Sequence, residues 1–368
     1  MSVTKINIVL FGIGNVGSAL INQIIKSQHF FLDKRNIELH IPVITNSTHA
    51  FFEKDGVKNY WETNFKKSAV PFQTNDIIEY AREQNLENLI AVDASASAEI
   101  TKWYIPLIQN GFHIVAANKK ANTLHIDFYK ELRRNLKRYN KQFNYETNVG
   151  GGLPVIQTIR DLHYSGERIT KIKGVLSGSI SYLFNRFSAE ENSFSSILSD
   201  AEKIGLTEPD SRDDLSGQDV ARKLLILARE LELELDITDV TVESLLLTNL
   251  NEKHSKAEYA INKSLFDSPY QIAKITQTDG HVLRYIGELD VVSKKLNVKL
   301  VSVVARSPLG QLMGADNLIE IYTDSYGEIP IVIQGAGAGK EVTARGVLTD
   351  ILKIGDAIKI QEMCYQNS

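Results

Sequence analysis

The sequence predicts an α/β protein with two domains, a doubly wound parallel sheet followed by a mixed α+β domain. Two observations predict the first domain. Short apolar runs alternate with amphipathic stretches over residues 5–148, and a glycine-rich turn follows the first run. The third observation concerns the chain past Gly152, where this alternation stops and helices mix with alternating strands. A chain of 368 residues is long enough for two hydrophobic cores.

The first domain is expected to contain five buried parallel strands. Near-continuous apolar runs of four to eight residues are typical of strands that are covered on both faces. The expected strands are 6–12, 39–45, 89–95, 112–118 and 143–148. Helical patterns lie between some of them, at 15–27, 76–84, 99–110 and 125–139.

The second domain is expected to begin with a helix at 153–165 and a strand at 168–177, with several helices up to about residue 235. Residues 282–291 and 298–305 alternate in strand fashion around a polar turn, which predicts an antiparallel hairpin. Residues 331–353 predict a strand, a glycine-rich turn and a helix that returns to the first domain. We therefore expect a dinucleotide-binding domain of 1–150 and 336–368, and a substrate-binding, catalytic and dimerisation domain of 151–335.

The composition excludes several classes of function. A net charge of −4 argues against nucleic acid as the main partner, which usually needs a basic face. No apolar run approaches eighteen residues, and the amino terminus lacks the order of a signal peptide, so neither a membrane span nor export is expected. The only cysteine, Cys364, lies in a polar tail. It allows no intrachain disulfide and is a poor candidate for a catalytic thiolate, and it fits the reducing cytoplasm.

A glycine-rich turn after the first strand is the candidate dinucleotide site. Residues 12–17 supply the G-x-G-x-x-G spacing, directly after a strand and at the start of a helix. The first glycine permits the tight turn, the second lets pyrophosphate approach the backbone, and the third allows close packing of helix on strand. The candidate cofactor-binding residues of this turn are Gly12, Ile13, Gly14, Asn15, Val16 and Gly17. The alternative is a glycine-rich turn with a structural role only. Dinucleotide binding in this context predicts a Rossmann-like domain.

The choice of cofactor is read from the end of the second strand. NAD-selective sites usually place an acid there to hold the ribose diol. Residues 46–49 read Asn-Ser-Thr-His, and Glu38 lies at the other end of the strand. A missing carboxylate removes repulsion against a 2′-phosphate, although no arginine is present to bind one. We expect NADP to be favoured and NAD to be tolerated.

The ends of two later strands carry polar residues that a ligand could meet, because ligands of open α/β sheets bind beyond the carboxyl ends of the strands. Ser95 and Ser97 follow one strand, and Asn118, Lys119 and Lys120 follow the next. A lysine at this edge can bind an anion of the cofactor or substrate, and Lys119 is the better placed. The alternative is that both lysines are surface charges.

The segment 207–223, TEPDSRDDLSGQDVARK, is unusually rich in charge. Residues 217–233 predict a helix with an apolar stripe, and Asp219 and Lys223, four residues apart, share a face beside it. Spacing alone favours an exposed ion pair of little energetic value. Near the start of the helix we expect carboxylates to cap backbone N–H groups, and we expect Arg212 to form an ion pair with one of them. The alternative is that these carboxylates bind magnesium or calcium. These carboxylates are Asp210, Asp213 and Asp214.

Six segments together resemble homoserine dehydrogenase, most closely the dehydrogenase half of the bifunctional aspartokinase–homoserine dehydrogenases. They are FGIGNVGSAL, VAANKKAN, ETNVGGGLPVIQTI, GVLSGSISYLFN, GLTEPDSRDDLSGQDVARKLLILARE and GAGAGKEVTARGVLTDIL. The resemblance covers about residues 5–355 in order. It implies reversible NAD(P)H-dependent reduction of L-aspartate 4-semialdehyde to L-homoserine, in the biosynthesis of threonine, methionine and isoleucine. It also implies a homodimer or a larger homo-oligomer.

The same resemblance implies roles for single residues. Glu208 matches a substrate-binding glutamate, and Lys119 matches an active-site lysine. Asp219 and Lys223 match a catalytic pair, of which Asp219 also binds the substrate. Gly339 matches a residue beside the nicotinamide, with Ser95 also on the cofactor. The positions that would hold a monovalent cation through their carbonyls, as in some members, are Glu146, Val149, Gly151 and Leu153. No kinase domain is seen ahead of Met1 and no regulatory domain after residue 355. We therefore expect no site in this sequence for feedback inhibition by threonine.

These roles fit the chemistry of an amino-acid aldehyde. A buried carboxylate such as Glu208 suits the substrate ammonium, and a cation such as Lys223 or Lys119 suits the oxygen on which charge develops. Two other hypotheses stay open at this point. One is a dinucleotide-binding sensor or partner subunit without catalysis, and the other is a dehydrogenase of a different amino acid or hydroxy acid.

Overall fold

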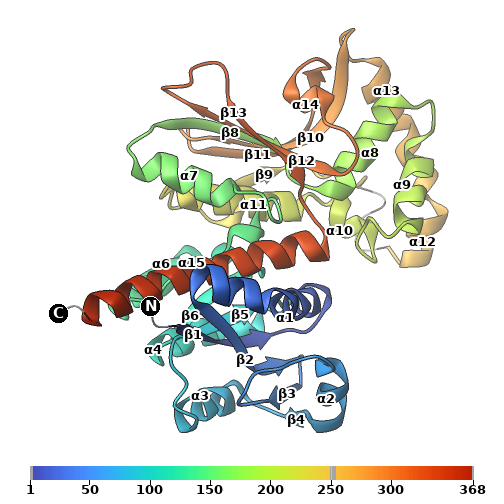
Figure 1. Ribbon diagram of the computed structural model, residues 1–368. Coiled ribbons are helices and arrows are strands. Elements are labelled where there is room, and N and C mark those ends of the chain that lie inside the picture. The colour runs from blue at the N-terminus through green and yellow to red at the C-terminus, as the bar shows by residue number, and fades with distance from the viewer. Residues whose placement is uncertain (1–2, 249, 251–253, 367–368) are drawn as a thin grey trace. The chain divides into compact units, whose positions relative to one another are not determined.

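The protein is described here from a computed structural model that places residues 3–248, 250 and 254–366. The chain divides into two compact units, one of residues 1–152 with 339–368 and the other of residues 153–338. Each unit has its own sheet (Figure 1). Within the described residues, no helix has the length and apolar character needed to cross a membrane.

The first unit has a seven-stranded sheet in the order β4-β3-β2-β1-β5-β6-β7. Its parallel part, β2-β1-β5-β6-β7, has the doubly wound order that the sequence predicts, with crossovers in both directions from β1. The strands are β1 (Thr4–Phe11), β2 (Ile37–Thr45), β3 (His49–Phe52), β4 (Val70–Pro71), β5 (Leu89–Asp93), β6 (His113–Ala116) and β7 (Phe143–Asn144). The antiparallel strands β3 and β4 extend the edge beyond β2 and were not predicted, because four- and two-residue strands leave too short a pattern.

The helices of this unit are α1 (Asn15–Arg35), α2 (Trp61–Ser68), α3 (Thr74–Glu83), α4 (Tyr104–Gln109), α5 (Lys120–Thr123), α6 (Ile126–Arg138) and α15 (Lys340–Gln366), with short 3₁₀ turns η1 (Glu99–Trp103) and η2 (Glu146–Asn148). Helix α1 runs two turns further than expected, and ends where Asn36 takes the left-handed conformation that closes a helix. Helix α15 packs against α1 and buries Val347, Leu348 and Ile351 in the same core as β1 (Figure 1).

One expected strand of the first unit is wrong in its length. The run 143–148 forms only the two residues of β7 and then turns into η2. The backbone N–H of Glu146 donates to the carboxylate of Asp350 on α15 at 2.8 Å, so this donor bonds to a side chain rather than to a neighbouring strand. The chain therefore leaves the sheet at Tyr145.

The second unit has a six-stranded sheet in the order β13-β12-β8-β10-β11-β9, antiparallel except for the pair β11–β9. The strands are β8 (Ile169–Val175), β9 (Val240–Val242), β10 (His281–Asp290), β11 (Lys295–Val304), β12 (Asp316–Thr323) and β13 (Ile331–Ala336). The predicted hairpin is confirmed as β10 and β11. Strands β9 and β12 were not predicted.

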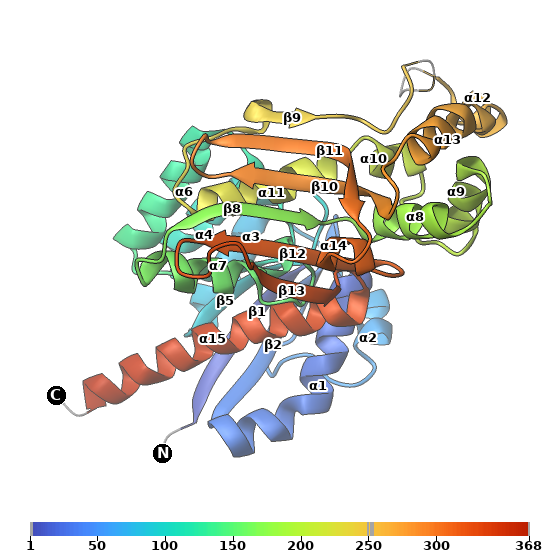
Figure 2. The ribbon, with the colours of Figure 1, turned by 90° about the horizontal axis from the view of Figure 1, so that it is seen from above.

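The helices of the second unit are α7 (Val155–Tyr164), α8 (Gly178–Ala189), α9 (Phe194–Lys203), α10 (Ser211–Leu215), α11 (Gln218–Glu230), α12 (Lys256–Ile261), α13 (Asp267–Ile275) and α14 (Pro308–Gln311), with turns η3 (Ile237–Asp239) and η4 (Lys263–Phe266). Helix α11 packs against α7, β9, β10 and β11, and α8 contacts β10 and β12 (Figure 2). The predicted stripe of α11 is confirmed, since Val220, Leu224 and Leu227 are buried. This packing fixes the helix that carries Asp219 and Lys223.

Candidate active site

The glycine turn of the first unit has the geometry that dinucleotide binding needs. Gly12 has a positive φ of 97°, and a Cβ on Gly17 would lie 1.9 Å from the carbonyl oxygen of Gly12. Both glycines are therefore required by the turn itself. Gly14, in contrast, has no heavy atom within 4 Å of the place of a Cβ, and it forms the N-cap of the 21-residue helix α1. Because the amino terminus of a helix favours anions and Gly14 leaves the backbone open, the turn fits a cofactor pyrophosphate.

Two alanine variants separate packing from binding in this turn. We expect Gly17→Ala to lower the melting temperature, at a cost of about 1–3 kcal/mol for the clash with Gly12, and to weaken cofactor binding. Gly14→Ala should leave the melting temperature near that of the unchanged protein but weaken cofactor binding about tenfold or more, because the methyl group fills the open space. Scanning fluorimetry and cofactor titration measure both. Unchanged cofactor affinity in Gly14→Ala would contradict the assignment.

A buried carboxylate that the sequence analysis missed organises the ends of β5 and β6. Asp93 is 1% exposed, and its Oδ1 accepts from the backbone N–H of Ser95 at 2.9 Å and from its hydroxyl at 2.7 Å. Its Oδ2 accepts from Tyr104 Oη at 2.7 Å and from Asn118 Nδ2 at 2.9 Å. Burial raises the pKa of Asp93, although these hydrogen bonds oppose the shift. Asp93 thus fixes Ser95 and Asn118, and the signal available in the sequence was an acid that closes an apolar run.

The loop after β2 carries no charged group for the ribose. Asn46 Oδ1 accepts backbone N–H groups from Thr48 at 2.9 Å and His49 at 2.7 Å, which closes a tight turn into β3. The side chain of Asn46 is thus engaged in the turn, and Thr48 Oγ1 lies 2.9 Å from His49 Nδ1. This loop presents neither an acid nor an arginine, as the sequence indicated.

Lys119 and Lys120 lie at the carboxyl end of β6, at the start of the short helix α5. Both are half-buried. The carbonyl of Lys119 accepts the Asn122 backbone N–H at 3.2 Å and the Thr123 hydroxyl at 3.2 Å. These bonds fix the backbone from which the Lys119 side chain extends.

Gly339 stands directly before α15, with a φ of 125° and open space where a Cβ would lie. In the segment proposed for a cation, the Glu146 carbonyl accepts the Val149 N–H at 3.4 Å and the Leu153 carbonyl accepts the Val155 N–H at 2.9 Å. Glu146 and Val149 are buried, and Gly151 has a φ of 62°.

In the second unit, Lys223 is held as a buried ammonium. Its side chain is 11% exposed, and Nζ donates to the carbonyl oxygen of Leu176 at 2.6 Å and meets Asp219 Oδ2 at 2.7 Å. Asp219 itself is 44% exposed in its side chain. The exposed pair that spacing alone favours is therefore wrong for the lysine. A lysine that is buried beside a carboxylate is a group whose proton can be given to a bound molecule.

Glu208 is joined to the same part of the unit through Asp214. The Glu208 backbone N–H donates to Asp214 Oδ2 at 2.8 Å, and Ser179 Oγ donates to Asp214 Oδ1 at 2.6 Å. Ser179 lies three residues after Leu176, whose carbonyl holds Lys223. The segment 176–179, which runs from the end of β8 into the first turn of α8, therefore links the loop that carries Glu208 to Lys223. No role was predicted from the sequence for the residues of this segment.

Two expectations about the acidic block are wrong. Glu208 is exposed rather than buried, and Asp214 binds Ser179 and the Glu208 backbone rather than capping a helix. The cap is Asp210, whose side chain accepts the Arg212 N–H at the start of α10, and the two side chains also pair at 2.7 Å as predicted. In the described part of the chain, no group of three or more histidine, cysteine or acidic side chains is arranged to hold a metal ion.

Asp214→Asn tests the electrostatics of this link. Burial raises the pKa of Asp214, helped by the negative charges of Asp219 and Asp213 and opposed by the hydrogen bonds of Ser179 and Glu208. A carboxyl with a raised pKa in the folded state contributes stability that is present below its unfolded pKa and is lost as pH rises through its folded pKa. The melting temperature of Asp214→Asn minus that of the unchanged protein should therefore increase from pH 4 to pH 7. A difference that is flat with pH, or that falls, would contradict the buried charge.

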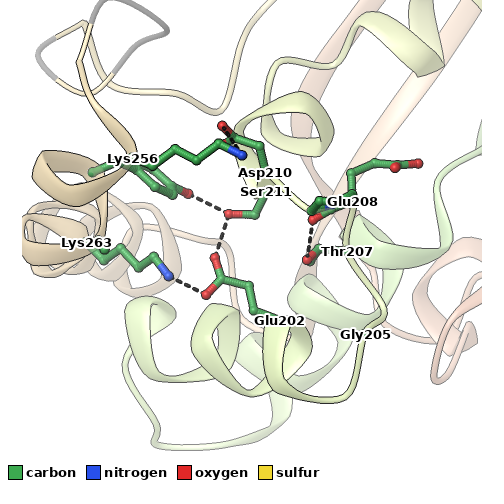
Figure 3. Close-up of a pocket in the computed structure, with 11 residues that line it drawn as sticks. Glu202, Gly205, Thr207, Glu208, Asp210, Ser211, Lys256 and Lys263 are labelled. Carbon is green, nitrogen blue, oxygen red and sulfur yellow. Dashed lines mark hydrogen bonds and ion pairs between the residues drawn. The ribbon is translucent and has the colours of Figure 1, made fainter.

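A cavity of about 430 Å³ lies beside the loop that carries Glu208 (Figure 3). Residues of 202–211 and of α12 and η4 line it. The polar groups that face it pair with each other: Glu202 with Lys263 and Ser211, and Ser211 with Tyr259. The side chain of Glu208 points away from Lys256 and Lys263 (Figure 3). Glu208 itself is among the residues that line the cavity.

Two family models match this chain. Residues 154–352 match the family model of homoserine dehydrogenase, and residues 12–146 match the model of the homoserine dehydrogenase NAD binding domain. The chain belongs to the homoserine dehydrogenase family. The resemblance and the fold class predicted from the sequence are confirmed, and the glycine turn lies in the NAD binding domain of this family.

Homoserine dehydrogenase relatives of two kinds are similar to this chain. The bifunctional aspartokinase/homoserine dehydrogenase of Buchnera aphidicola is 38% identical over 351 residues, which are 95% of this chain and 42% of that protein. The homoserine dehydrogenase of Saccharomyces cerevisiae is 35% identical over 368 residues, covering 97% of this chain and 100% of that protein. The chain thus spans less than half the length of the bifunctional relatives. A solved structure of a Candida auris protein of unknown function is 31% identical, with a TM-score of 0.87 over 96% of this chain and 98% of that one.

Proposed function

We propose that the chain catalyses the reversible NAD(P)H-dependent reduction of L-aspartate 4-semialdehyde to L-homoserine, in the biosynthesis of threonine, methionine and isoleucine. The observation that carries the proposal is the buried ammonium of Lys223, 2.6 Å from the Leu176 carbonyl and 2.7 Å from Asp219. Membership of the family and its NAD binding domain support it. The proposed division of labour is cofactor binding by residues 1–150 and 336–368, and substrate binding, catalysis and dimerisation by residues 151–335.

The proposed chemistry at Lys223 is proton transfer. When bound, the reduced nicotinamide supplies a hydride, and the reduction also consumes one proton. Lys223 Nζ gives that proton to the substrate oxygen, and neutral Lys223 takes it back from the hydroxyl of homoserine in the reverse direction. Before the transfer, its positive charge stabilises the negative charge that develops on the oxygen. Asp219 keeps the ammonium in place through their ion pair.

The proposed role of Glu208 is to bind the amino group of the substrate. Its carboxylate can accept a charge-assisted hydrogen bond from the substrate ammonium. Asp214 fixes the Glu208 backbone through the 2.8 Å bond to its N–H, and so sets where the carboxylate can reach. Lys119, at the end of β6, would meet an anionic group of the cofactor or substrate. Ser95 and Gly339 would contact the cofactor beside Gly12, Gly14 and Gly17.

One assay tests this proposal. Homoserine with oxidised cofactor should give reduced cofactor, followed by its absorbance, whereas malate and glutamate should give none. Turnover with malate or glutamate and not with homoserine would assign another substrate, and cofactor binding without turnover on any of the three would assign a sensor.

We propose NADP as the favoured cofactor, with NAD accepted. The support is the loop after β2, where Asn46 and its neighbours offer no carboxylate to repel a 2′-phosphate. The ratio of kcat/KM for NADP to that for NAD measures the preference, and a ratio below one would contradict it.

Two further features are proposals from the resemblance. A monovalent cation on the carbonyls of Glu146, Val149, Gly151 and Leu153 should make turnover faster in sodium or potassium chloride than in choline chloride at equal ionic strength, and equal rates would contradict it.

A homodimer or larger homo-oligomer should show a mass of at least twice that of the chain by light scattering. The single cysteine Cys364, which is exposed, fits activity in a reducing compartment such as the cytoplasm.

A further inference from the structure

The carbonyl that holds Lys223 is itself held by a second side chain. The Leu176 oxygen accepts Lys223 Nζ at 2.6 Å and Asn317 Nδ2 at 3.2 Å. Asn317 lies on β12 and is 1% exposed. The carboxamide and the ammonium therefore meet at one backbone oxygen, at the end of β8.

Asn317 is out of place as a packing residue. Alternate residues of a strand face the same side of a sheet, so Asn317 shares its side with Ile319 and Ile321, which are both fully buried. Within the described residues, its Oδ1 is buried without a hydrogen-bond partner. A buried carbonyl oxygen without a partner is unfavourable, and a leucine of similar volume would avoid that cost. The hydrogen bond to Leu176 is the contact that the amide makes and leucine cannot.

The orientation of the carboxamide is set by a glycine. A Cβ on Gly337 would lie 2.0 Å from Asn317 Cγ and 2.1 Å from Nδ2, so the amide lies directly against the backbone that follows β13. Any side chain at position 337 would displace it. Gly337 and Asn317 are paired in this way although twenty residues separate them in the sequence.

We propose that Asn317 is a positioning residue for Lys223, which it holds through the Leu176 carbonyl, with Gly337 keeping the amide in place. The inference rests on the proposed function, because it concerns how the proton-transferring ammonium is oriented. It assigns Asn317 no contact with the reacting atoms. Loss of the amide frees the Leu176 carbonyl and lets Nζ move, which affects proton transfer more than substrate binding.

The test replaces Asn317 by leucine and compares it with Asn185→Leu. Asn185 is a matched control, since its Nδ2 also donates to a backbone carbonyl, that of Gly314 at 2.8 Å, and its Oδ1 is likewise buried without a partner among the described residues. Asn317→Leu should keep or raise the melting temperature and lower kcat for homoserine oxidation about tenfold, with KM for homoserine changed less than about threefold. Asn185→Leu should leave kcat within about twofold of the unchanged protein.

A second variant covers the case in which Asn317→Leu does not fold. Gly337→Ala removes no polar group but pushes the carboxamide off Leu176, and should lower kcat in the same way. A kcat within about twofold of the unchanged protein in the folded Asn317 or Gly337 variant would overturn the inference, as would an equal loss in Asn185→Leu. If the unchanged protein does not oxidise homoserine at all, the proposed function fails, and the inference fails with it.

Discussion

Lys223→Ala is expected to lower kcat for homoserine oxidation about 10²–10⁴-fold, the usual contribution of a proton-transferring group. Cofactor affinity should stay close to that of the unchanged protein. The expected loss is large because Nζ is both the proton carrier and the positive charge that stabilises the oxygen. Steady-state kinetics with homoserine and a cofactor titration measure the two quantities.

A matched lysine separates this effect from the loss of any ion pair. Lys203 on α9 pairs with Asp200 at 3.7 Å and is 76% exposed in its side chain, so its pair is of the kind that contributes little. Lys203→Ala should therefore keep full activity. Near-normal turnover in Lys223→Ala would remove this lysine from the mechanism, whatever the fate of its ion pair with Asp219.

Glu208→Gln is expected to raise KM for homoserine about ten- to a hundredfold, with a smaller change in kcat. A hydrogen bond to a charged group contributes about 1.5–3 kcal/mol, and the substitution keeps the size of the side chain while removing its charge. The exposed position of Glu208 in the structure means that the carboxylate is accessible to substrate, and that the fold should tolerate glutamine.

The control for this variant is Glu191→Gln, a change of the same charge at another exposed site of the second unit. Its KM for homoserine should equal that of the unchanged protein. That result would show that the net charge of the protein does not determine substrate binding. An unchanged KM in Glu208→Gln would disprove ammonium binding by this residue.

The parts of the fold that the sequence predicts correctly depend on local patterns. The glycine turn at 12–17 needs only three residues at fixed spacing after a strand. Helix α11 is predicted by its apolar stripe. The β10–β11 hairpin is predicted by the alternation of apolar and polar residues and by its polar turn. The missed strand β12 contains the buried polar residues Asn317 and Glu320, which break the apolar pattern of an interior strand. The amide of Asn317 binds the carbonyl of Leu176, which is distant in the sequence, and a local pattern does not contain such a contact.

The candidate site shows the same division. The i,i+4 spacing of Asp219 and Lys223 predicts their ion pair correctly, but not the burial of the lysine, because the Leu176 carbonyl that holds Nζ lies 47 residues away. The types of residue in a sequence do not show which backbone carbonyl will accept a hydrogen bond from a distant side chain. The role of Asp214 was likewise missed, since the position of a carboxylate near a helix start suggested a cap, while the tertiary contact with Ser179 decides where it points.

A crystal structure of the protein with homoserine and oxidised cofactor would show whether Lys223 and Glu208 bind the two ends of the substrate. We expect the substrate hydroxyl within hydrogen-bonding distance, about 3 Å, of Lys223 Nζ, and the substrate ammonium at the same distance from the Glu208 carboxylate. Homoserine bound with its hydroxyl on another group, while Lys223 stays on Leu176 and Asp219 alone, would contradict this expectation.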